Sequence, residues 1–228
     1  MMQKWKILIG ISCLCILLAA CGKTTNFKAE KDIEIQNFQY TNHENKTVTL
    51  DDLQGKPWLA LFIFTSCTTV CQPMMANMAD IQDALKEKGI EDYRIVGFSV
   101  DPEVDTPKKL ANYLKNYEVA DESKWDLLTG YTQQDIEKLA VKSFQTLVKK
   151  TEGEDQVTHG TSFALVNQQG HVVKTYSGFT DVPKDEIVVD VESIIQDSKI
   201  VSKKRINKVK NTILFLLNGI FCLLKHYF

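Results

Sequence analysis

The central part of the chain combines continuous apolar runs with a helical pattern. Residues 56–65 (KPWLALFIFT) and 93–100 (YRIVGFSV) are short apolar runs, which are typical of strands buried on both faces. Between them, from Met74 to Leu85, apolar residues recur at intervals of four and three, which places them on one helical face. Gly89 follows as a residue that commonly ends a helix. The pattern predicts a strand, a helix and a second strand.

The rest of the central region predicts further helices and a hairpin. Thr106 is a good N-cap with Pro107 at the first helical position, and Thr132 is a second N-cap. We expect an early strand at residues 45–50 and a strand between these two helices at residues 125–128. Two hairpin strands are expected at residues 162–166 and 171–176, and a last helix from Pro183 onward. The order βαβα(β)αββα predicts an α/β three-layer fold, with a mixed sheet and helices on both faces.

The N-terminus has the pattern of an export signal. Two lysines precede the apolar stretch from Ile7 to Leu18, and Ala19 and Ala20 then precede Cys21. The sequence Leu-Ala-Ala-Cys resembles the bacterial lipoprotein box, which implies cleavage after a signal peptide at 1–20 and lipid attachment to Cys21. An ordinary signal peptide with a chance cysteine is the alternative. Residues 21–31 are expected to be a polar, lipidated tether to the outer face of the cytoplasmic membrane.

The C-terminus differs from the rest of the chain. Residues 203–228 carry six basic residues and no acids, and include the apolar stretch 213–224, which is too short to span a bilayer. A basic segment followed by an apolar one suits a membrane surface, but an extension without a fixed role is an equal alternative. We therefore separate a domain at 32–200 from a C-terminal extension at 201–228.

Charge is distributed unevenly along the chain. Because both ends are basic, residues 22–202 hold 19 basic and 29 acidic residues, a net charge of −10. An acidic domain argues against nucleic-acid binding. The hydrophobic content of 44% is enough for a sizeable core.

Two cysteines lie at the predicted end of the first long strand. Cys67 and Cys71 are four residues apart, so on a helix they share one face with their α-carbons roughly 6 Å apart. That distance permits a disulfide, redox chemistry or shared metal binding. With the element order, a cysteine pair at this place resembles a thioredoxin-like fold with an inserted helical region.

A histidine favours the metal interpretation of this pair, with a solvated loop histidine that binds no metal as the alternative. His159 ends an acidic loop just before residues 162–166, and a parallel topology is expected to bring that loop to the cysteine end of the sheet. The other histidines, His43, His171 and His226, lie in a polar loop, a hairpin strand and the tail. Two thiolates and one imidazole suit copper, with Cu(I) satisfied by the sulfurs and Cu(II) adding the histidine. Zinc would accept the same ligands with a water.

The chain resembles the Sco/SenC proteins, which are copper-binding thioredoxin-like proteins that help assemble the CuA centre of cytochrome c oxidase. The resemblance covers about residues 32–197. Its motifs are CTTVC with Pro73 and Met74 after it, SVDPEVDTP (99–107), VTH (157–159) and YSG (176–178). It implies one copper per chain, as Cu(I) or Cu(II), with Cys67, Cys71 and His159 as ligands.

The same resemblance implies a partner and a nearby acidic residue. Cytochrome c oxidase subunit II, which carries the CuA site, would receive copper or be kept reduced by the protein. Asp101 is expected either to support the site from outside the ligand set or to face the partner, with a plain turn role as the alternative. The family usually has proline directly after the second cysteine, whereas Gln72 precedes Pro73 here.

Two rival functions use the same cysteines. An extracytoplasmic thiol-disulfide oxidoreductase or redox sensor would use Cys67 and Cys71 as a redox-active pair without His159. Against it, three residues separate the cysteines rather than two, and no proline precedes the strand at 162–166. A peroxiredoxin-type peroxidase is a weaker rival, because the proline expected a few residues before Cys67 is missing.

Overall fold

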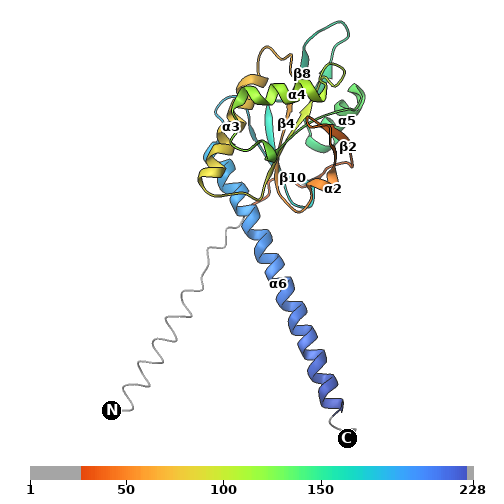
Figure 1. The fold of residues 1–228 in the computed structure, drawn as a ribbon, viewed down its shortest axis with the longest axis vertical. Coiled ribbons are helices and arrows are strands. Elements are labelled where there is room, and N and C mark those ends of the chain that lie inside the picture. The colour runs from red at the N-terminus through yellow and green to blue at the C-terminus, as the bar shows by residue number, and fades with distance from the viewer. Residues whose placement is uncertain (1–26, 225–228) are drawn as a thin grey trace, which may run out of the picture. The chain divides into compact units, whose positions relative to one another are not determined.

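The computed structural model describes residues 27–224 (Figure 1). One compact unit spans Phe27–Ile195, and a second unit holds the described residues from Gln196 onward. The predicted signal peptide and Cys21 lie outside the described residues.

A mixed eight-stranded sheet forms the centre of the domain. Its order is β1-β10-β9-β4-β5-β6-β2-β3. The strands span Ile33–Glu34 (β1), Gln39–Asn42 (β2), Thr47–Thr49 (β3), Trp58–Ile63 (β4), Arg94–Ser99 (β5), Trp125–Thr129 (β6), Ser162–Val166 (β9) and His171–Ser177 (β10). Strands β4, β5 and β6 are parallel, whereas β9 and β10 form an antiparallel hairpin. The predicted α/β fold with a mixed sheet is confirmed.

Two of the helices begin at the threonine caps that the sequence predicts. The helices are α2 (Leu50–Leu53), α3 (Cys71–Glu87), α4 (Pro107–Leu114), α5 (Gln133–Phe144) and α6 (Lys184–Leu224), with 3₁₀ turns η1 (Lys115–Tyr117) and η2 (Glu122–Lys124). The side chain of Thr106 accepts a hydrogen bond from the backbone of Lys109, and Thr132 forms a capping box with Asp135. In the view of Figure 1, α3 and α5 lie on either side of β4.

The core encloses β4 completely, as the apolar run predicts. All six of its residues are buried. On one face Trp58 and Phe62 pack against Phe144 of α5. The ring centroid of Phe144 lies 6.3 Å from that of Trp58 and 5.3 Å from that of Phe62. Because close packing on both faces restricts the movement of β4, the loop that follows Ile63 starts from a rigid position.

The direction of β9 corrects one prediction. We expected a parallel topology to bring the residues before this strand to the cysteine end of the sheet, but β9 is antiparallel to β4, with Trp58 opposite Val166 and Ala60 opposite Ala164. The antiparallel direction is what places the start of β9 beside the end of β4. The expected proximity holds, for the opposite reason.

A second small sheet was not predicted. Strands β7 (Val148–Lys150) and β8 (Val157–His159) pair only with each other, as an antiparallel hairpin. His159 is therefore the last residue of a strand and not part of a loop. Three-residue strands that contain lysine and threonine carry too little periodicity to be recognised.

The last helix is longer than expected. Helix α6 continues from the domain to Leu224, through most of the basic and apolar extension. Within residues 27–224, no helix is both long enough and apolar enough to cross a bilayer.

Candidate metal centre

The two cysteines lie on the loop after β4 and at the start of α3. Cys67 belongs to the loop, and Cys71 is the first residue of the helix. The N-cap residue, Val70, makes no side-chain capping bond, so the first amide groups of α3 need other acceptors. The backbone N–H of Cys71 donates to Sγ of Cys67 at 3.4 Å. The predicted position of the pair, between strand and helix, is confirmed.

Both thiols are reduced and buried, with different acidities. Neither forms a disulfide; Cys67 is 6% exposed and Cys71 is fully buried. Burial acts to raise the pKa of Cys67, but hydrogen bonds from Cys71 and Thr69 outweigh it and hold that pKa below its usual value. Burial, together with the hydrogen bond to Cys67, raises the pKa of Cys71 well above its usual value. Cys67 is therefore the more readily ionised thiol.

His159, the last residue of β8, lies next to the cysteine pair. Its Nε2 lies 3.2 Å from Sγ of Cys71, and its Nδ1 lies 2.9 Å from the carbonyl oxygen of Gly160. A carbonyl can only accept, so Nδ1 carries the proton and Nε2 presents its lone pair to the thiols. Burial lowers the pKa of His159, which favours the neutral imidazole. The ring of Phe64 lies edge-to-face with the imidazole, with the two ring centroids 5.8 Å apart, and this contact also restrains the plane of the imidazole.

The three side chains form a compact donor set. One ligand atom from each of Cys67, Cys71 and His159 lies within 4.8 Å of the others. Among the residues that the structure describes, this is the one group of three or more histidine, cysteine or carboxylate side chains close enough to share an ion. Two sulfurs and a neutral imidazole fit copper or zinc by ligand type. The residues present therefore fit the predicted metal.

The remaining described histidines are occupied elsewhere. Nδ1 of buried His43 accepts from the backbone N–H of Leu127 at 3.2 Å, and Nδ1 of His171 lies 2.5 Å from a carboxylate oxygen of Asp32. His226 and Cys21 lie outside the described residues. His159 is the histidine that the structure brings to the thiols.

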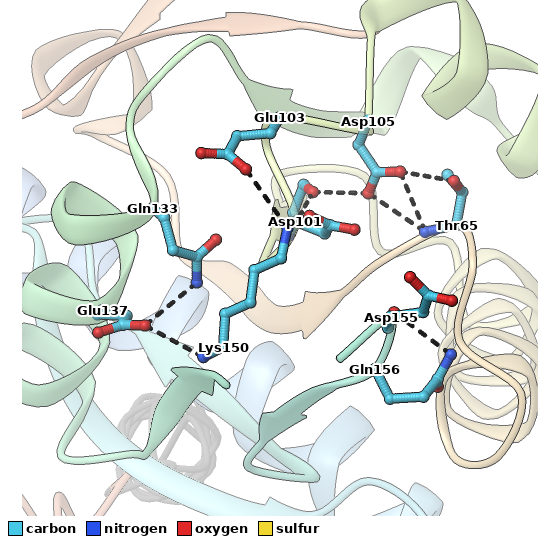
Figure 2. A network of polar contacts seen from close by, with 10 residues as sticks. Thr65, Asp101, Glu103, Asp105, Gln133, Glu137, Lys150, Asp155 and Gln156 are labelled. Carbon is cyan, nitrogen blue, oxygen red and sulfur yellow. Dashed lines mark hydrogen bonds and ion pairs between the residues drawn. The ribbon is translucent and has the colours of Figure 1, made fainter. Parts of the chain in front are cut away.

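Asp101 is buried beside the site rather than in it. Its side chain is 4% exposed and its Oδ1 lies 2.6 Å from Nζ of Lys150, which also reaches Glu103 (Figure 2). A carboxylate enclosed in this way does not present itself to a partner surface. The structure places Asp101 against the hairpin that carries His159.

Two residues that organise the site were missed by the sequence interpretation. Asp105 is 1% exposed and accepts a hydrogen bond from Oγ1 of Thr65 at 2.5 Å (Figure 2). It also accepts one from Oγ of Ser99 at 2.6 Å. Gln156 donates from Nε2 to the carbonyl oxygen of Ser66 at 3.1 Å. Asp105 stands inside the SVDPEVDTP motif, which was a signal for it, whereas nothing in the sequence pointed to Gln156.

Comparison with known proteins places this centre in a family. The sequence profile of the SCO1/SenC family matches residues 27–196. The SCO1 protein homolog of Bacillus subtilis (strain 168) is 48% identical over 178 residues, which cover 78% of this chain and 91% of that protein. The crystal structure of a SCO1/SenC family lipoprotein from Bacillus anthracis str. Ames is 43% identical with a TM-score of 0.69, and the match covers 73% and 99% of the two chains.

Two further solved structures bear on the chemistry. BsSco, described as a member of the Sco family of cytochrome c oxidase assembly proteins with a disulfide switch, is 47% identical over 73% of this chain and 97% of its own, with a TM-score of 0.67. Arabidopsis thaliana ScoI with copper bound is 29% identical over 71% and 98%, with a TM-score of 0.60. The thioredoxin-like fold is thereby confirmed, and the chain belongs to the SCO1/SenC family.

Proposed function

We propose that this protein binds one copper ion per chain through Cys67, Cys71 and His159. The observation that carries the proposal is the donor set itself: two reduced sulfurs and one neutral imidazole nitrogen, all within 4.8 Å. These are soft and borderline ligands, which suit copper in both oxidation states. The copper-bound Arabidopsis ScoI structure supports the choice of copper over zinc.

The two oxidation states use the donors differently. Two thiolates satisfy Cu(I), which accepts low coordination numbers with soft ligands, whereas Cu(II) also takes the imidazole of His159. The thiols must be reduced before either ion is bound, so metal uptake and thiol redox state are linked. When bound, copper supplies a one-electron couple, and the chain supplies the two sulfurs and the oriented Nε2.

The biological role we propose is the assembly of a respiratory oxidase. The protein would deliver copper to the CuA site of cytochrome c oxidase subunit II, or keep the cysteines of that site reduced. The description of BsSco as a member of a family of cytochrome c oxidase assembly proteins supports this role. A copper transfer assay with the soluble CuA domain, scored by CuA absorption, would test it.

The direct test of copper binding uses a pair of histidine variants. Reduced protein should take up one Cu(II) with strong thiolate-to-copper charge-transfer absorption. In His159→Ala the Cu(II) complex should weaken greatly, because the third ligand is lost. His171→Ala is the matched control, since His171 pairs with Asp32 away from the thiols. Equal Cu(II) affinity in His159→Ala and the parent would show that histidine ligation is wrong.

A thiol-disulfide exchange function is the second candidate. The observation that favours it is the lowered pKa of Cys67 next to a second reduced thiol, which is the arrangement of an attacking and a resolving cysteine. Turnover of a disulfide substrate by the reduced protein, without any copper uptake, would establish this function in place of copper binding.

We also propose a lipid anchor at Cys21, on the outer face of the cytoplasmic membrane. The lipoprotein box supports it, as does the description of the Bacillus anthracis relative as a lipoprotein. Mass analysis of the mature N-terminus should find Cys21 as the first residue with acyl chains attached. An unmodified residue at the cleavage point would rule the anchor out.

A further inference from the structure

The third ligand is carried by an element outside the main sheet. The β7–β8 hairpin forms a two-stranded sheet of its own, and the turn that joins its strands, residues 151–156, is exposed. His159 ends β8 directly opposite Val148 of β7. The orientation of the imidazole toward Cys71 therefore depends on how this hairpin is held against the rest of the domain.

The first attachment is an ion pair on β7. Nζ of Lys150 lies 2.6 Å from Oδ1 of Asp101, whose side chain is 4% exposed, and 3.4 Å from Oε2 of Glu103. The pKa of Lys150 is raised, chiefly by its bond to Asp101. The backbone N–H of the same lysine donates to Oε1 of Glu137 on α5 at 3.1 Å. Figure 2 shows the lysine side chain extending from Glu137 toward Asp101 and Glu103.

The second attachment is an amide at the other side of the hairpin. Nε2 of Gln156 donates to the carbonyl oxygen of Ser66 at 3.1 Å. Its Oε1 accepts from the backbone N–H and the hydroxyl of Thr68, both at 3.4 Å. Ser66 and Thr68 are the two neighbours of Cys67 in the chain. Gln156 therefore joins the histidine hairpin to the segment that holds the first thiol.

We propose that Lys150 and Gln156 are positioning residues that hold His159 at the thiols and thereby set the preference of the site for Cu(II) relative to Cu(I). This inference rests on the proposed copper function. Cu(II) needs the imidazole, whereas Cu(I) is satisfied by two sulfurs that belong to a different segment. Loosening the hairpin removes a ligand from Cu(II) alone. The buried Asp101 is then the anchor point of the hairpin.

The test compares two lysines on the same strand. Lys150→Met removes the ammonium but keeps a stem of similar size, and we expect it to weaken Cu(II) binding by about 10- to 100-fold, as is usual for groups that orient metal ligands. Cu(I) affinity should stay at the parent value. Lys149→Met is the matched control, because Lys149 is 62% exposed and its Nζ pairs with Glu137, at 3.3 Å, instead of reaching Asp101. Lys150→Arg, which keeps the ion pair, should restore Cu(II) binding.

Two results would overturn the inference. One is Cu(II) affinity in Lys150→Met equal to that of the parent; the other is an equal loss of both ions, which indicates general damage to the site. If Lys150→Met fails to fold, Gln156→Ala decides, because Gln156 is exposed and its loss leaves no buried charge. Gln156→Ala should show the same selective loss of Cu(II), and parent-like binding of both ions would overturn the inference.

A metal-free measurement separates this inference from the proposed function. The amide of Gly160 donates to the carbonyl oxygen of Leu147, so its hydrogen exchange reports opening of the hairpin base. Exchange at Gly160 should be faster in Lys150→Met than in Lys149→Met, without any copper present. A parent protein that binds no copper would refute the function but leave this result standing. Equal exchange in the two variants would refute the positioning role.

Discussion

The imidazole of His159 is oriented by the residue that follows it. The carbonyl oxygen of Gly160 accepts the Nδ1 proton, so the free lone pair of Nε2 points at Cys71. Gly160 also packs closely against Thr146, where a Cβ atom would lie 1.9 Å from Oγ1. The glycine therefore permits the backbone position from which His159 reaches the thiols. The donor set depends on this one residue without a side chain.

Gly160→Ala should weaken Cu(II) binding by about tenfold or more, because the added methyl group must displace either Thr146 or the backbone next to His159. Isothermal titration with Cu(II) and with Cu(I) measures the effect, and the affinity for Cu(I) should equal that of the parent. Gly153→Asn is the control within the same hairpin: its Cβ meets no atom within 4 Å, and asparagine tolerates the positive φ of 82° there. Parent-like Cu(II) binding in Gly160→Ala would show that the close approach of Gly160 to Thr146 does not position His159.

The two thiols should differ in reactivity with pH. The pKa of Cys67 is lowered from 9.0, so its thiolate appears at lower pH than that of an ordinary cysteine, whereas the pKa of Cys71 is raised and its thiol stays protonated over the same range. Iodoacetamide should modify Cys67 first, with a rate midpoint below pH 9. Peptide mapping by mass spectrometry measures this rate. In Cys71→Ala, loss of the side-chain hydrogen bond to Cys67 should raise the midpoint. Faster modification of Cys71 would show that the assignment is reversed.

At the scale of elements, the site is the meeting point of α3 and the β7–β8 hairpin. Helix α3 begins at Cys71, and Gln72 and Pro73 occupy its second and third positions. Amide groups in the first turn have no acceptor within the helix, so a proline there removes no intrahelical bond. The glutamine that departs from the family pattern is exposed and leaves the cysteine spacing intact. It therefore alters no ligand.

Gln72→Pro, which restores the usual family sequence, should leave the affinities for both copper ions unchanged. Its effect on the free energy of unfolding should be at most about 1 kcal/mol, because proline at a backbone position that it can adopt changes stability by about 0.4–1 kcal/mol. Urea denaturation and a copper titration test both statements. A large change in Cu(II) affinity would mean that Gln72 contributes to the position of Cys71.

Element prediction succeeded where periodicity and caps are strong. The buried strands β4 and β5 and the caps Thr106 and Thr132 were all predicted from local sequence. Strand direction was not, because an apolar run looks the same in a parallel or an antiparallel neighbour. The contact between Lys150 and Asp101, 49 positions apart, belongs to the tertiary structure and has no local signal.

At the scale of the whole molecule, the donor set exists only in the folded chain. Cys71 and His159 are 88 positions apart and are brought together because β9 runs antiparallel to β4. The cysteine pair could be predicted from its spacing alone. His159 could be singled out among four histidines by its place before the strand at 162–166, although the expected parallel topology was wrong, and the family resemblance implied the same residue.

Copper should therefore stabilise the fold. A ligand that binds the native state alone raises the free energy of unfolding, by about 2.7 kcal/mol at a free concentration one hundred times its Kd. Differential scanning calorimetry of reduced protein should show a higher Tm with Cu(II). The increase should be smaller in His159→Ala, whereas His171→Ala should respond as the parent does. An equal increase in His159→Ala and the parent would contradict native-state binding through this histidine.

The most direct measurement is X-ray absorption at the copper edge of the protein loaded with one Cu(II). We expect two sulfur scatterers and one imidazole in the first coordination sphere, with the imidazole lost in His159→Ala and retained in His171→Ala. A copper sphere made only of nitrogen and oxygen, or one that keeps its imidazole in His159→Ala, would contradict the proposed centre.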